Sequence, residues 1–254
     1  IRETLKSLNK DIIGIEITST SDIPSGTGLG SSGTFGVAFQ LALREYYNLQ
    51  RDKFKLASES TIIEKDILRR PIGLQDQYIS SFGGLTEFSV LENGYVSASK
   101  NINTPKTLEI IKDNLFLYFT DFSRDASTIL AQQSKDMSDS EKSNEFENII
   151  EMGKFMYKSL VDGDLEAYAG CMHDYWMLKR ERQKEHTMTK INEVYDHLYS
   201  KKLICGGKLV GAGGTGFLLL ASKMPEKLHN EMTKFGLKQL EFNIDDEGAK
   251  IIQC

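Results

Sequence analysis

The apolar and polar positions near the start of the chain change from a strand-like to a helical spacing. In Ile12–Thr20 the isoleucines alternate with polar residues, which is typical of a strand with one buried face. Thr34–Tyr47 is apolar almost all round and is long enough to predict a buried helix. Phe54–Leu68 has the spacing of a second helix, which should end at the proline and glycine that follow it.

The rest of the chain mixes helical and strand-like segments. Helical spacing is found in Gln77–Phe82, Glu151–Leu178 and Ile191–Leu203. The charged segment Asp136–Asn148 is typical of the solvated start or face of a helix. Apolar runs with the length of strands are Leu85–Leu91, Leu115–Thr120 and the two runs that flank Gly211–Gly216. Because helices and strands do not alternate regularly, the pattern favours an α+β fold.

Two glycine-rich segments, Gly28–Gly33 and Gly211–Gly216, match the G-x-G-x-x-G pattern of dinucleotide-binding loops. That fold requires a strand directly before the loop, and a helix and a second strand after it. Here a polar segment precedes the first loop and a second helix follows its helix, while a strand-like run follows the second loop. Neither loop carries the lysine of a Walker A motif. The context therefore argues against both nucleotide-binding motifs.

The first glycine-rich loop is nevertheless suited to phosphate. Gly26, Gly28 and Gly30 allow the backbone to approach a ligand closely. Ser31 and Ser32 stand where the long helix should begin, and the unpaired N–H groups and the dipole of a helix N-terminus attract anions. From these residues alone, a plain turn in which a serine caps the helix is an equal alternative.

Three motifs, in order along the chain, resemble those of the superfamily that contains galactokinase, homoserine kinase, mevalonate kinase and phosphomevalonate kinase (GHMP kinases). They are Pro24–Ser32 (P-x-x-x-G-L-G-S-S), Gly73–Gln77 (G-x-x-D-Q) and the glycine-rich Lys208–Phe217. The resemblance implies a two-lobed α+β fold, with an ATP-binding N-terminal lobe in residues 1–104 and a C-terminal lobe in residues 105–254. The family opens with a glycine-rich strand that has no counterpart here. We therefore expect an N-terminal lobe without its first strands, and a numbering that starts inside a longer polypeptide.

Further segments resemble the heptose 7-phosphate kinase branch of that superfamily. They are Gln75–Tyr78, Phe82–Gly84, Leu117–Thr120 with Ser123–Arg124, and Gly206–Gly214. Members of this branch phosphorylate the anomeric hydroxyl of D-glycero-D-manno-heptose 7-phosphate. Leu74, Asp121 and Thr215 depart from the residues usual in the branch, and these departures concern the sugar more than the nucleotide.

The resemblance also implies roles for individual residues. Asp76 is expected to orient or deprotonate the sugar hydroxyl. Glu64, twelve positions earlier, and Ser32 are expected to bind Mg²⁺, with Ser31 as the second choice for the hydroxyl ligand. Residues expected to bind ATP are Pro24, Gly26, Gly28, Leu29, Gly30, Ser31, Ser32 and Gly33. Residues expected to bind the sugar phosphate are Gln75, Arg124, Lys208, Gly213 and Gly214.

Without the resemblance, the same residues have plainer interpretations. An aspartate after a glycine is more often a turn residue than a catalytic group, which applies to Asp76. Most helical glutamates are solvated, which applies to Glu64. Lysines and arginines such as Lys208 and Arg124 are more often surface cations.

Composition narrows the class of partner. The 254 residues carry a net charge of −5 and contain no long basic run, which argues against nucleic acid. Three widely spaced cysteines favour neither a disulfide framework nor a zinc site, and fit a reducing, cytoplasmic environment. No apolar run approaches membrane-spanning length. ATP and a sugar phosphate are therefore the expected partners, and the oligomeric state stays open.

Two alternatives remain at this point. The chain could be another sugar kinase of the superfamily, with a galactose-, fucose- or arabinose-like substrate. It could also be a non-catalytic relative that binds a nucleotide or a sugar. A degenerate binding protein would be expected to lose Asp76 or Glu64, and both acids are present.

Overall fold

The computed structural model divides the chain into two compact units. Unit 1 contains Ile1–Ser25, Gly30–Lys100 and Ile244–Cys254, and unit 2 contains Gly26–Leu29 and Asn101–Asn243. The residues that the structure describes are 1–10, 14–91, 93–99, 102, 104–120, 140–182, 189–211 and 216–252. The expected lobes, residues 1–104 and 105–254, differ from these units, because Gly26–Leu29 would belong to the first lobe and Ile244–Cys254 to the second. The boundary between the lobes stays a prediction.

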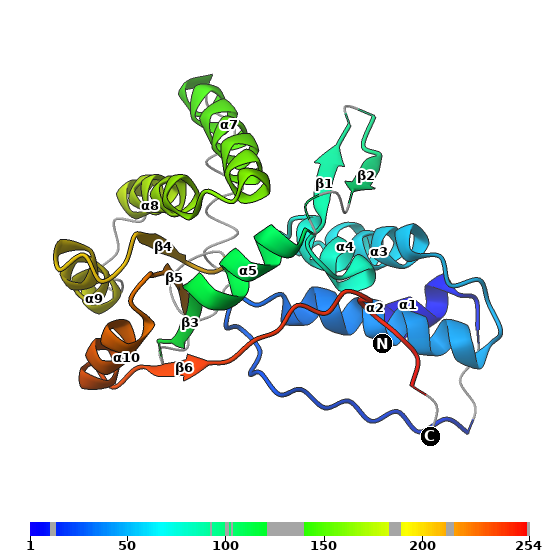
Figure 1. Cartoon of the computed structure of the whole chain (residues 1–254). Coiled ribbons are helices and arrows are strands. Elements are labelled where there is room, and N and C mark those ends of the chain that lie inside the picture. The colour runs from blue at the N-terminus through cyan, green and yellow to red at the C-terminus, as the bar shows by residue number, and fades with distance from the viewer. Residues whose placement is uncertain are drawn as a thin grey trace. The chain divides into compact units, whose positions relative to one another are not determined.

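Unit 1 is built mainly from helices (Figure 1). Its elements are α1 (Arg2–Ser7), α2 (Ser31–Tyr46), α3 (Lys53–Thr61), a π-helical turn η1 (Ile62–Ile67), α4 (Gln75–Phe82), β1 (Glu87–Val90) and β2 (Val96–Ser99). The helices α2, α3 and α4 pack on one another, and the two strands form an antiparallel hairpin. These elements confirm the helices predicted from the apolar spacing, and β1 confirms the strand predicted at Leu85–Leu91.

A buried ion pair joins α2 to α3. Arg44, in the last turn of α2, is 3% exposed and pairs with Glu59 of α3. Its second nitrogen, Nη1, donates to the carbonyl oxygen of Gln50 at 2.7 Å. Asp52 then caps α3 by accepting a hydrogen bond from the backbone N–H of Lys55 at 2.9 Å. The turn between the two helices is therefore held by its own polar groups.

The strand predicted at Ile12–Thr20 is wrong for the described residues of that segment. Residues 14–20 form no strand, and Ile17 is 38% exposed. Figure 1 shows them as an extended trace in dark blue. An extended segment becomes a strand only where a neighbour exchanges backbone hydrogen bonds with it, and within the described residues no strand pairs with this segment.

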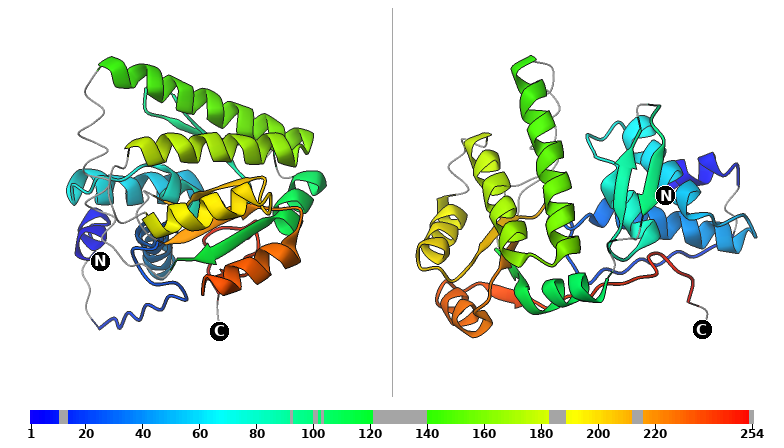
Figure 2. Two further views of the ribbon diagram at one scale, coloured as in Figure 1. Left: turned by 90° about the vertical axis from the view of Figure 1, so that its left-hand side faces the viewer. Right: turned by 45° about the horizontal axis from the view of Figure 1, so that its top comes forward.

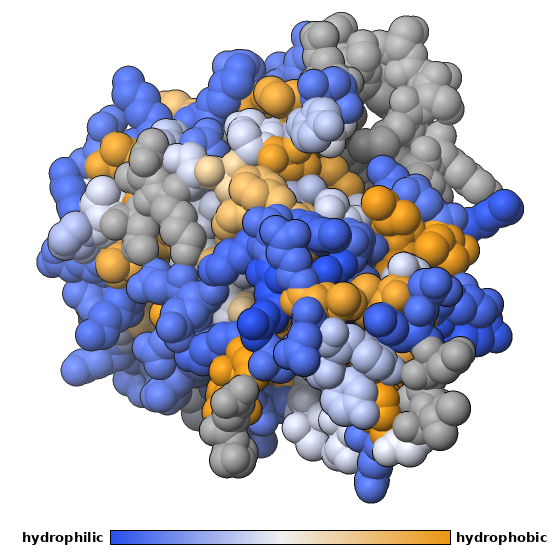
Figure 3. Space-filling view, turned by 90° about the vertical axis from the view of Figure 1, so that its right-hand side faces the viewer, coloured by the Kyte–Doolittle hydropathy of each residue, from blue (hydrophilic) through white to orange (hydrophobic). Residues whose placement is uncertain are grey.

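Unit 1 leaves several large apolar side chains exposed. They include Phe35, Tyr46, Phe54, Ile62, Val90 and Tyr95. On the face that Figure 3 shows, hydrophobic residues form separate patches among hydrophilic ones. Scattered exposure of this kind is common on soluble proteins and does not by itself indicate a partner.

Unit 2 contains a four-stranded antiparallel sheet in the order β4-β5-β3-β6. Its strands are β3 (Leu115–Phe119), β4 (Gly206–Leu209), β5 (Phe217–Ala221) and β6 (Lys238–Leu240). Its helices are α5 (Pro105–Asn114), α7 (Ser140–Asp162), α8 (Leu165–Arg182), α9 (Thr189–Ser200) and α10 (Pro225–Lys234). The core of this unit is formed by buried residues of the sheet, α8, α9 and α10, among them Trp176, Tyr118, Tyr195 and Met232.

The helical segment Glu151–Leu178 is divided into two helices. Gly163, with φ of +74°, ends α7, and the Asp164 side chain accepts a hydrogen bond from the N–H of Ala167 at 3.0 Å to begin α8. The two helices then lie side by side (Figure 2). The periodicity therefore predicted the helical residues correctly but not the turn between them.

One glycine fixes how α8 lies on the sheet. A Cβ atom at Gly206 of β4 would overlap the carbonyl oxygen of Ala169 in α8, so this strand and this helix are in backbone contact. The contact brings Lys208, two residues along β4, to the side of α8.

The α+β fold class predicted from the sequence is confirmed. In the part of the chain that the structure covers, no helix is both long and apolar enough to span a membrane.

The ion pair between α2 and α3 can be tested by removing one charge. We expect Glu59→Gln to lower the free energy of unfolding by about 2–3 kcal/mol, because it leaves the buried Arg44 guanidinium without a counter-charge. Glu247→Gln is the matched control, since Glu247 forms an exposed pair with Lys250 in the same unit, and its effect should be below ~1 kcal/mol. Urea denaturation measures both variants, and equal stability of the two would contradict the importance of the buried pair.

Candidate functional site

The N-terminus of α2 is open to a ligand. Gly30 occupies the position before the helix in a left-handed conformation, with φ of +70° and ψ of +26°. Within the described chain, no side chain caps this end and no acidic residue lies in its first turn. The alternative in which a serine caps the helix is therefore wrong, because Ser31 and Ser32 lie inside the helix. The first N–H groups of α2 remain available for an anion.

Ser32 instead directs its hydroxyl to Glu64. Its Oγ donates to Oε1 of Glu64 at 2.6 Å, and Gln77 of α4 donates from Nε2 to Oε2 at 2.8 Å. Arg70 lies farther away, with Nη1 3.6 Å from Oε1. Glu64 is 6% exposed, so it is not the solvated surface acid of the plainer interpretation. Its carboxylate is a buried acceptor beside the first turn of α2.

A π-helical turn presents Glu64 in this direction. The N–H of Leu68 donates to the carbonyl oxygen of Ile63 at 2.9 Å, a bond across five residues that widens the helix. Such turns are rare and often occur at functional sites. The apolar spacing of Phe54–Leu68 predicted a helix but gave no sign of the wider turn.

Asp76 lies against the same end of α2. A Cβ atom at Gly33 would be 2.9 Å from Cβ of Asp76, and a Cβ atom at Gly30 would be 3.1 Å from its Cγ. Both glycines therefore permit a backbone approach that a side chain would obstruct. Thr34 and Ser80 add a hydrogen bond of 2.9 Å between the two helices. Gly30, Ser32, Glu64 and Asp76 are thus brought together within unit 1.

The surroundings of Asp76 raise its pKa. Burial is the largest cause, and the nearby charge of Glu64 acts in the same direction, while a hydrogen bond from the Gln75 side chain lowers it. A carboxylate with a raised pKa is a stronger proton acceptor than an exposed one. The proton-accepting form is lost as the pH falls through this raised pKa.

The remaining part of the first glycine-rich loop belongs to unit 2. A Cβ atom at Gly28, which has φ of +82°, would be 2.8 Å from the carbonyl oxygen of Val210. One at Gly216 would overlap the carbonyl oxygen of Thr27. The two glycine-rich segments, far apart in the sequence, are therefore in backbone contact. Pro24 and Gly26 are exposed, and Leu29 is half-buried.

Two lysines lie beside the second glycine-rich segment. Lys208 of β4 places Nζ 5.4 Å from the centre of the Tyr175 ring. Lys179 of α8 is 9% exposed and donates from Nζ to the carbonyl oxygen of Gly211 at 2.5 Å. Burial lowers the pKa of both lysines, that of Lys179 to about 8, where the charge of Lys208 is the second cause.

Sequence reasoning overlooked Gln77 and Lys179. Gln77 lies in the G-x-x-D-Q motif next to Asp76, and only the aspartate of that motif was assigned a role. Lys179 follows Met172 and Trp176 at helical spacing, so a lysine on the apolar face of a helix was the sign that could have found it. Arg124, Gly213 and Gly214, with Ser123, Asp121 and Thr215, lie outside the described residues.

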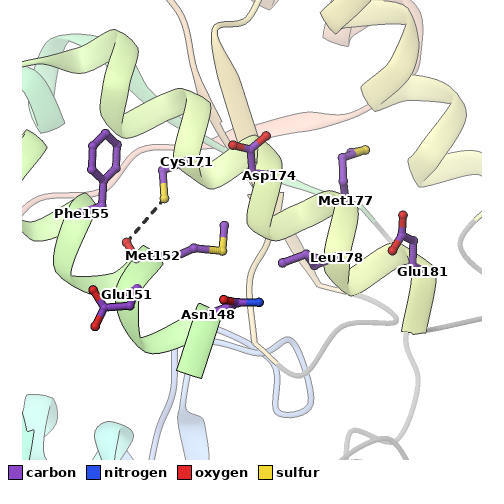
Figure 4. A pocket seen from close by; sticks show the side chains of 9 residues that line it. All are labelled: Asn148, Glu151, Met152, Phe155, Cys171, Asp174, Met177, Leu178 and Glu181. Carbon is purple, nitrogen blue, oxygen red and sulfur yellow. Dashed lines mark hydrogen bonds between the residues drawn. The ribbon is translucent and has the colours of Figure 1, made fainter. Parts of the chain in front are cut away.

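A separate cavity of about 650 Å³ lies between α7 and α8. Figure 4 shows side chains of both helices around it, including Met152, Phe155, Cys171 and Met177. It is lined by none of the residues predicted for the site.

The oxygen atoms of Glu64 and Ser32 suit magnesium. Among the described residues, no group of three or more histidine, cysteine, aspartate or glutamate side chains could hold a metal ion by itself. Mg²⁺ is commonly held by one or two carboxylates together with substrate phosphates and water. The pair formed by Glu64 and Ser32 fits that role.

Part of the chain matches a family of known proteins. Residues 1–84 match the sequence model of the GHMP kinases N terminal domain. These residues are a GHMP kinases N terminal domain. Its motifs Pro24–Ser32 and Gly73–Gln77, on which the resemblance was based, both lie within the matched residues.

Known proteins are similar to this chain over most of its length. The D-glycero-alpha-D-manno-heptose 7-phosphate kinase of Campylobacter jejuni is 27% identical over 97% of this chain and 73% of its own length. The L-fucokinase/L-fucose-1-P guanylyltransferase of Bacteroides fragilis is 26% identical over 84% of this chain, which corresponds to 23% of that larger protein.

Solved structures share the fold of this chain. The structure of a D-glycero-D-manno-heptose 1-phosphate kinase from Bacteroides thetaiotaomicron aligns with a TM-score of 0.71 and 21% identity, covering 99% of this chain and 72% of that one. A mevalonate kinase structure aligns with a TM-score of 0.66 and 19% identity, covering 94% and 72%.

The close contact between α2 and α4 yields a stability prediction. We expect Gly33→Ala to lower the free energy of unfolding by about 1–3 kcal/mol, because the added methyl group meets Cβ of Asp76 at the helix start. In Gly36→Ala, three residues along the same helix, the nearest atom is 3.7 Å away, so stability should stay equal or rise by up to ~1 kcal/mol. Denaturant titration compares the two. A Gly33→Ala protein as stable as Gly36→Ala would show that the approach of the helices is looser than described.

Proposed function

We propose that this protein is an ATP-dependent sugar kinase of the GHMP kinase family that uses Mg²⁺. The acceptor that we propose is the anomeric hydroxyl of D-glycero-D-manno-heptose 7-phosphate. The heptose 7-phosphate kinase of Campylobacter jejuni, which matches 97% of the chain, supports this sugar. The observation that carries the proposal is the position of Asp76 beside the uncapped N-terminus of α2.

The nucleotide would bind through the first glycine-rich loop. The free N–H groups at the start of α2 favour a phosphate, and glycine at position 30 leaves the backbone accessible. Residues 26–29 of the loop are proposed to contact the nucleotide through their backbone in the same manner. This combination requires no Walker A lysine.

Asp76 would act on the acceptor hydroxyl. A sugar hydroxyl is a weak nucleophile, and a carboxylate within hydrogen-bond reach can orient it and accept its proton. The sugar oxygen then forms a bond to the γ-phosphorus as the bond from that phosphorus to the β–γ bridging oxygen breaks, and ADP leaves. Phosphoryl transfer depends mainly on position and charge, so orientation by Asp76 matters as much as proton removal.

Glu64 and Ser32 would hold the metal ion at the start of α2. When bound, Mg²⁺ supplies positive charge against the phosphate oxygens of ATP. Gln77, which donates to the second oxygen of Glu64, is proposed to fix the orientation of that carboxylate.

A second sugar is favoured by a specific relative. The Bacteroides fragilis protein that matches 84% of the chain carries an L-fucokinase activity in its name, and this supports a free, fucose-like sugar as the alternative acceptor. The two acceptors differ in chemistry, because only the heptose substrate carries a phosphate before the reaction.

Replacement of the proposed base tests the reaction. We expect Asp76→Asn to lower kcat by about 10²–10⁴-fold, since an amide cannot accept the hydroxyl proton. ATP affinity should change little, because the nucleotide rests on the glycine-rich loop. Asp66→Asn, an exposed acid on η1, is the control and should retain full turnover. A coupled ADP-release assay with the heptose phosphate measures both, and near-normal turnover of Asp76→Asn would refute the assigned role.

The proposed metal ligands can be tested separately. We expect Glu64→Gln to require a several-fold higher Mg²⁺ concentration for half-maximal turnover, and Ser32→Ala to show a smaller shift, because Mg²⁺ binds a charged carboxylate more strongly than a hydroxyl. Magnesium titrations at saturating ATP compare the variants with the wild type. If both curves coincide with the wild-type curve, neither residue is a metal ligand.

A further inference from the structure

Two cations of unit 2, the buried Lys179 and the half-buried Lys208, have no opposite charge beside them among the described residues. Lys179 donates its hydrogen bond to a neutral carbonyl, that of Gly211, and Lys208 lies over the Tyr175 ring. Across the described residues, neither lysine forms an ion pair with a carboxylate, and the interaction between the two lysines is a repulsion. Both positive charges are therefore shielded from water, Lys179 more than Lys208, and no carboxylate of the described residues balances them.

An uncompensated buried charge is costly, and folded proteins normally pair it. The same chain follows this rule elsewhere, because the buried guanidinium of Arg44 has Glu59 as its partner. Burial lowers the pKa of both lysines, and the charge of Lys208 further lowers that of Lys179. At neutral pH Lys179, with a pKa of about 8, is still mostly charged. An anionic ligand would remove the repulsion.

The position of the lysines indicates which anion. The carbonyl group that Lys179 contacts belongs to Gly211, and a Cβ atom at Gly211 would be 2.6 Å from Cα of Gly28. Gly28 belongs to the loop proposed to bind phosphate. Lysine is a compact point charge that commonly binds phosphate groups. Two lysines beside this glycine-rich backbone therefore form a site suited to a phosphate group.

We propose that Lys179 and Lys208 together bind a phosphate group of a substrate. The inference rests on the proposed kinase function for the identity of that substrate, which is either ATP or the phosphorylated sugar. Two lysines would then also distinguish a sugar phosphate from a free sugar, if the phosphate is that of the acceptor. Tyr175 would hold Lys208 in place through its ring.

Binding measurements on four variants test the proposal. Lys179→Met and Lys208→Met each remove one charge at similar volume, Lys208→Arg keeps the charge, and Lys154→Met removes an exposed lysine of α7 as the control. Calorimetry would measure the affinity for MgATP, for heptose 7-phosphate and for unphosphorylated heptose. ³¹P NMR spectroscopy would measure the affinity for inorganic phosphate. We expect Lys179→Met and Lys208→Met each to weaken the binding of at least one phosphate ligand by about 10-fold or more. Lys208→Arg should retain much of the affinity, and Lys154→Met should match the wild type.

The pattern of losses identifies the source of the phosphate. Weaker binding of MgATP alone assigns the site to the nucleotide. Weaker binding of heptose 7-phosphate, with unchanged binding of the unphosphorylated heptose, assigns it to the acceptor. Unchanged affinity of both methionine variants for all three phosphate ligands would overturn the proposal, as would a wild-type protein that binds none of them.

Stability and turnover provide independent readings. Without ligand, the methionine variants should be at least as stable as the wild type, because each removes the repulsion between the two lysines. A marked loss of stability in both would mean that the lysines serve the fold, which contradicts the proposal. Failure of the kinase function gives a different result: the wild type would transfer no phosphate from ATP to a sugar, while inorganic phosphate would still bind and Lys179→Met would still weaken it.

Discussion

The candidate site depends on the missing side chains at Gly30 and Gly33. Without a Cβ atom at these positions, the first turn of α2 reaches the start of α4. The carboxyl group of Asp76 thereby comes to lie beside the N–H groups of that turn, which no side chain of the described residues caps. Two further features of the unit 1 site depend on this contact. It fixes the end of α2 from which Ser32 reaches Glu64, and it removes Asp76 from water, so that burial raises its pKa.

Much of this arrangement could be predicted from the sequence, and the limits have physical causes. Apolar spacing located α2, α3, α4 and the sheet strands β3 and β5, because burial imposes a regular period on the residues that face a core. The strand predicted at Ile12–Thr20 does not form in the described residues 14–20. A strand also needs a neighbouring strand to pair with, and the spacing of apolar residues does not show whether one is present. The contact of Ser32 with Glu64 was implied only by family resemblance. Lys179 was overlooked since nothing local shows that a helical lysine lies beside a distant glycine loop.

Arg44 and the pair formed by Lys179 and Lys208 show different solutions to one electrostatic problem. Arg44 has an acidic partner from the neighbouring helix and thereby joins α2 to α3. Lys179 and Lys208 have only a carbonyl group and an aromatic ring among the residues described. A charge balanced within the fold contributes to stability, whereas a charge left unbalanced reduces stability until a ligand arrives. The location of charges that lack a counter-charge is therefore informative about where a ligand binds, even where the shape of a cavity is not.

The π-helical turn at Ile62–Ile67 has a consequence for the register of the polypeptide. Successive residues of an α-helix are rotated by about 100° around the axis. A turn with one additional residue therefore changes which residues face the neighbouring helix from that point on. Glu64 faces Ser32 and Gln77 because the chain accommodates that additional residue. Deletion of a single residue ahead of Glu64, such as Ile62, would rotate the carboxylate by about 100° relative to α3, and it would be lost from α2 without any change to its own codon.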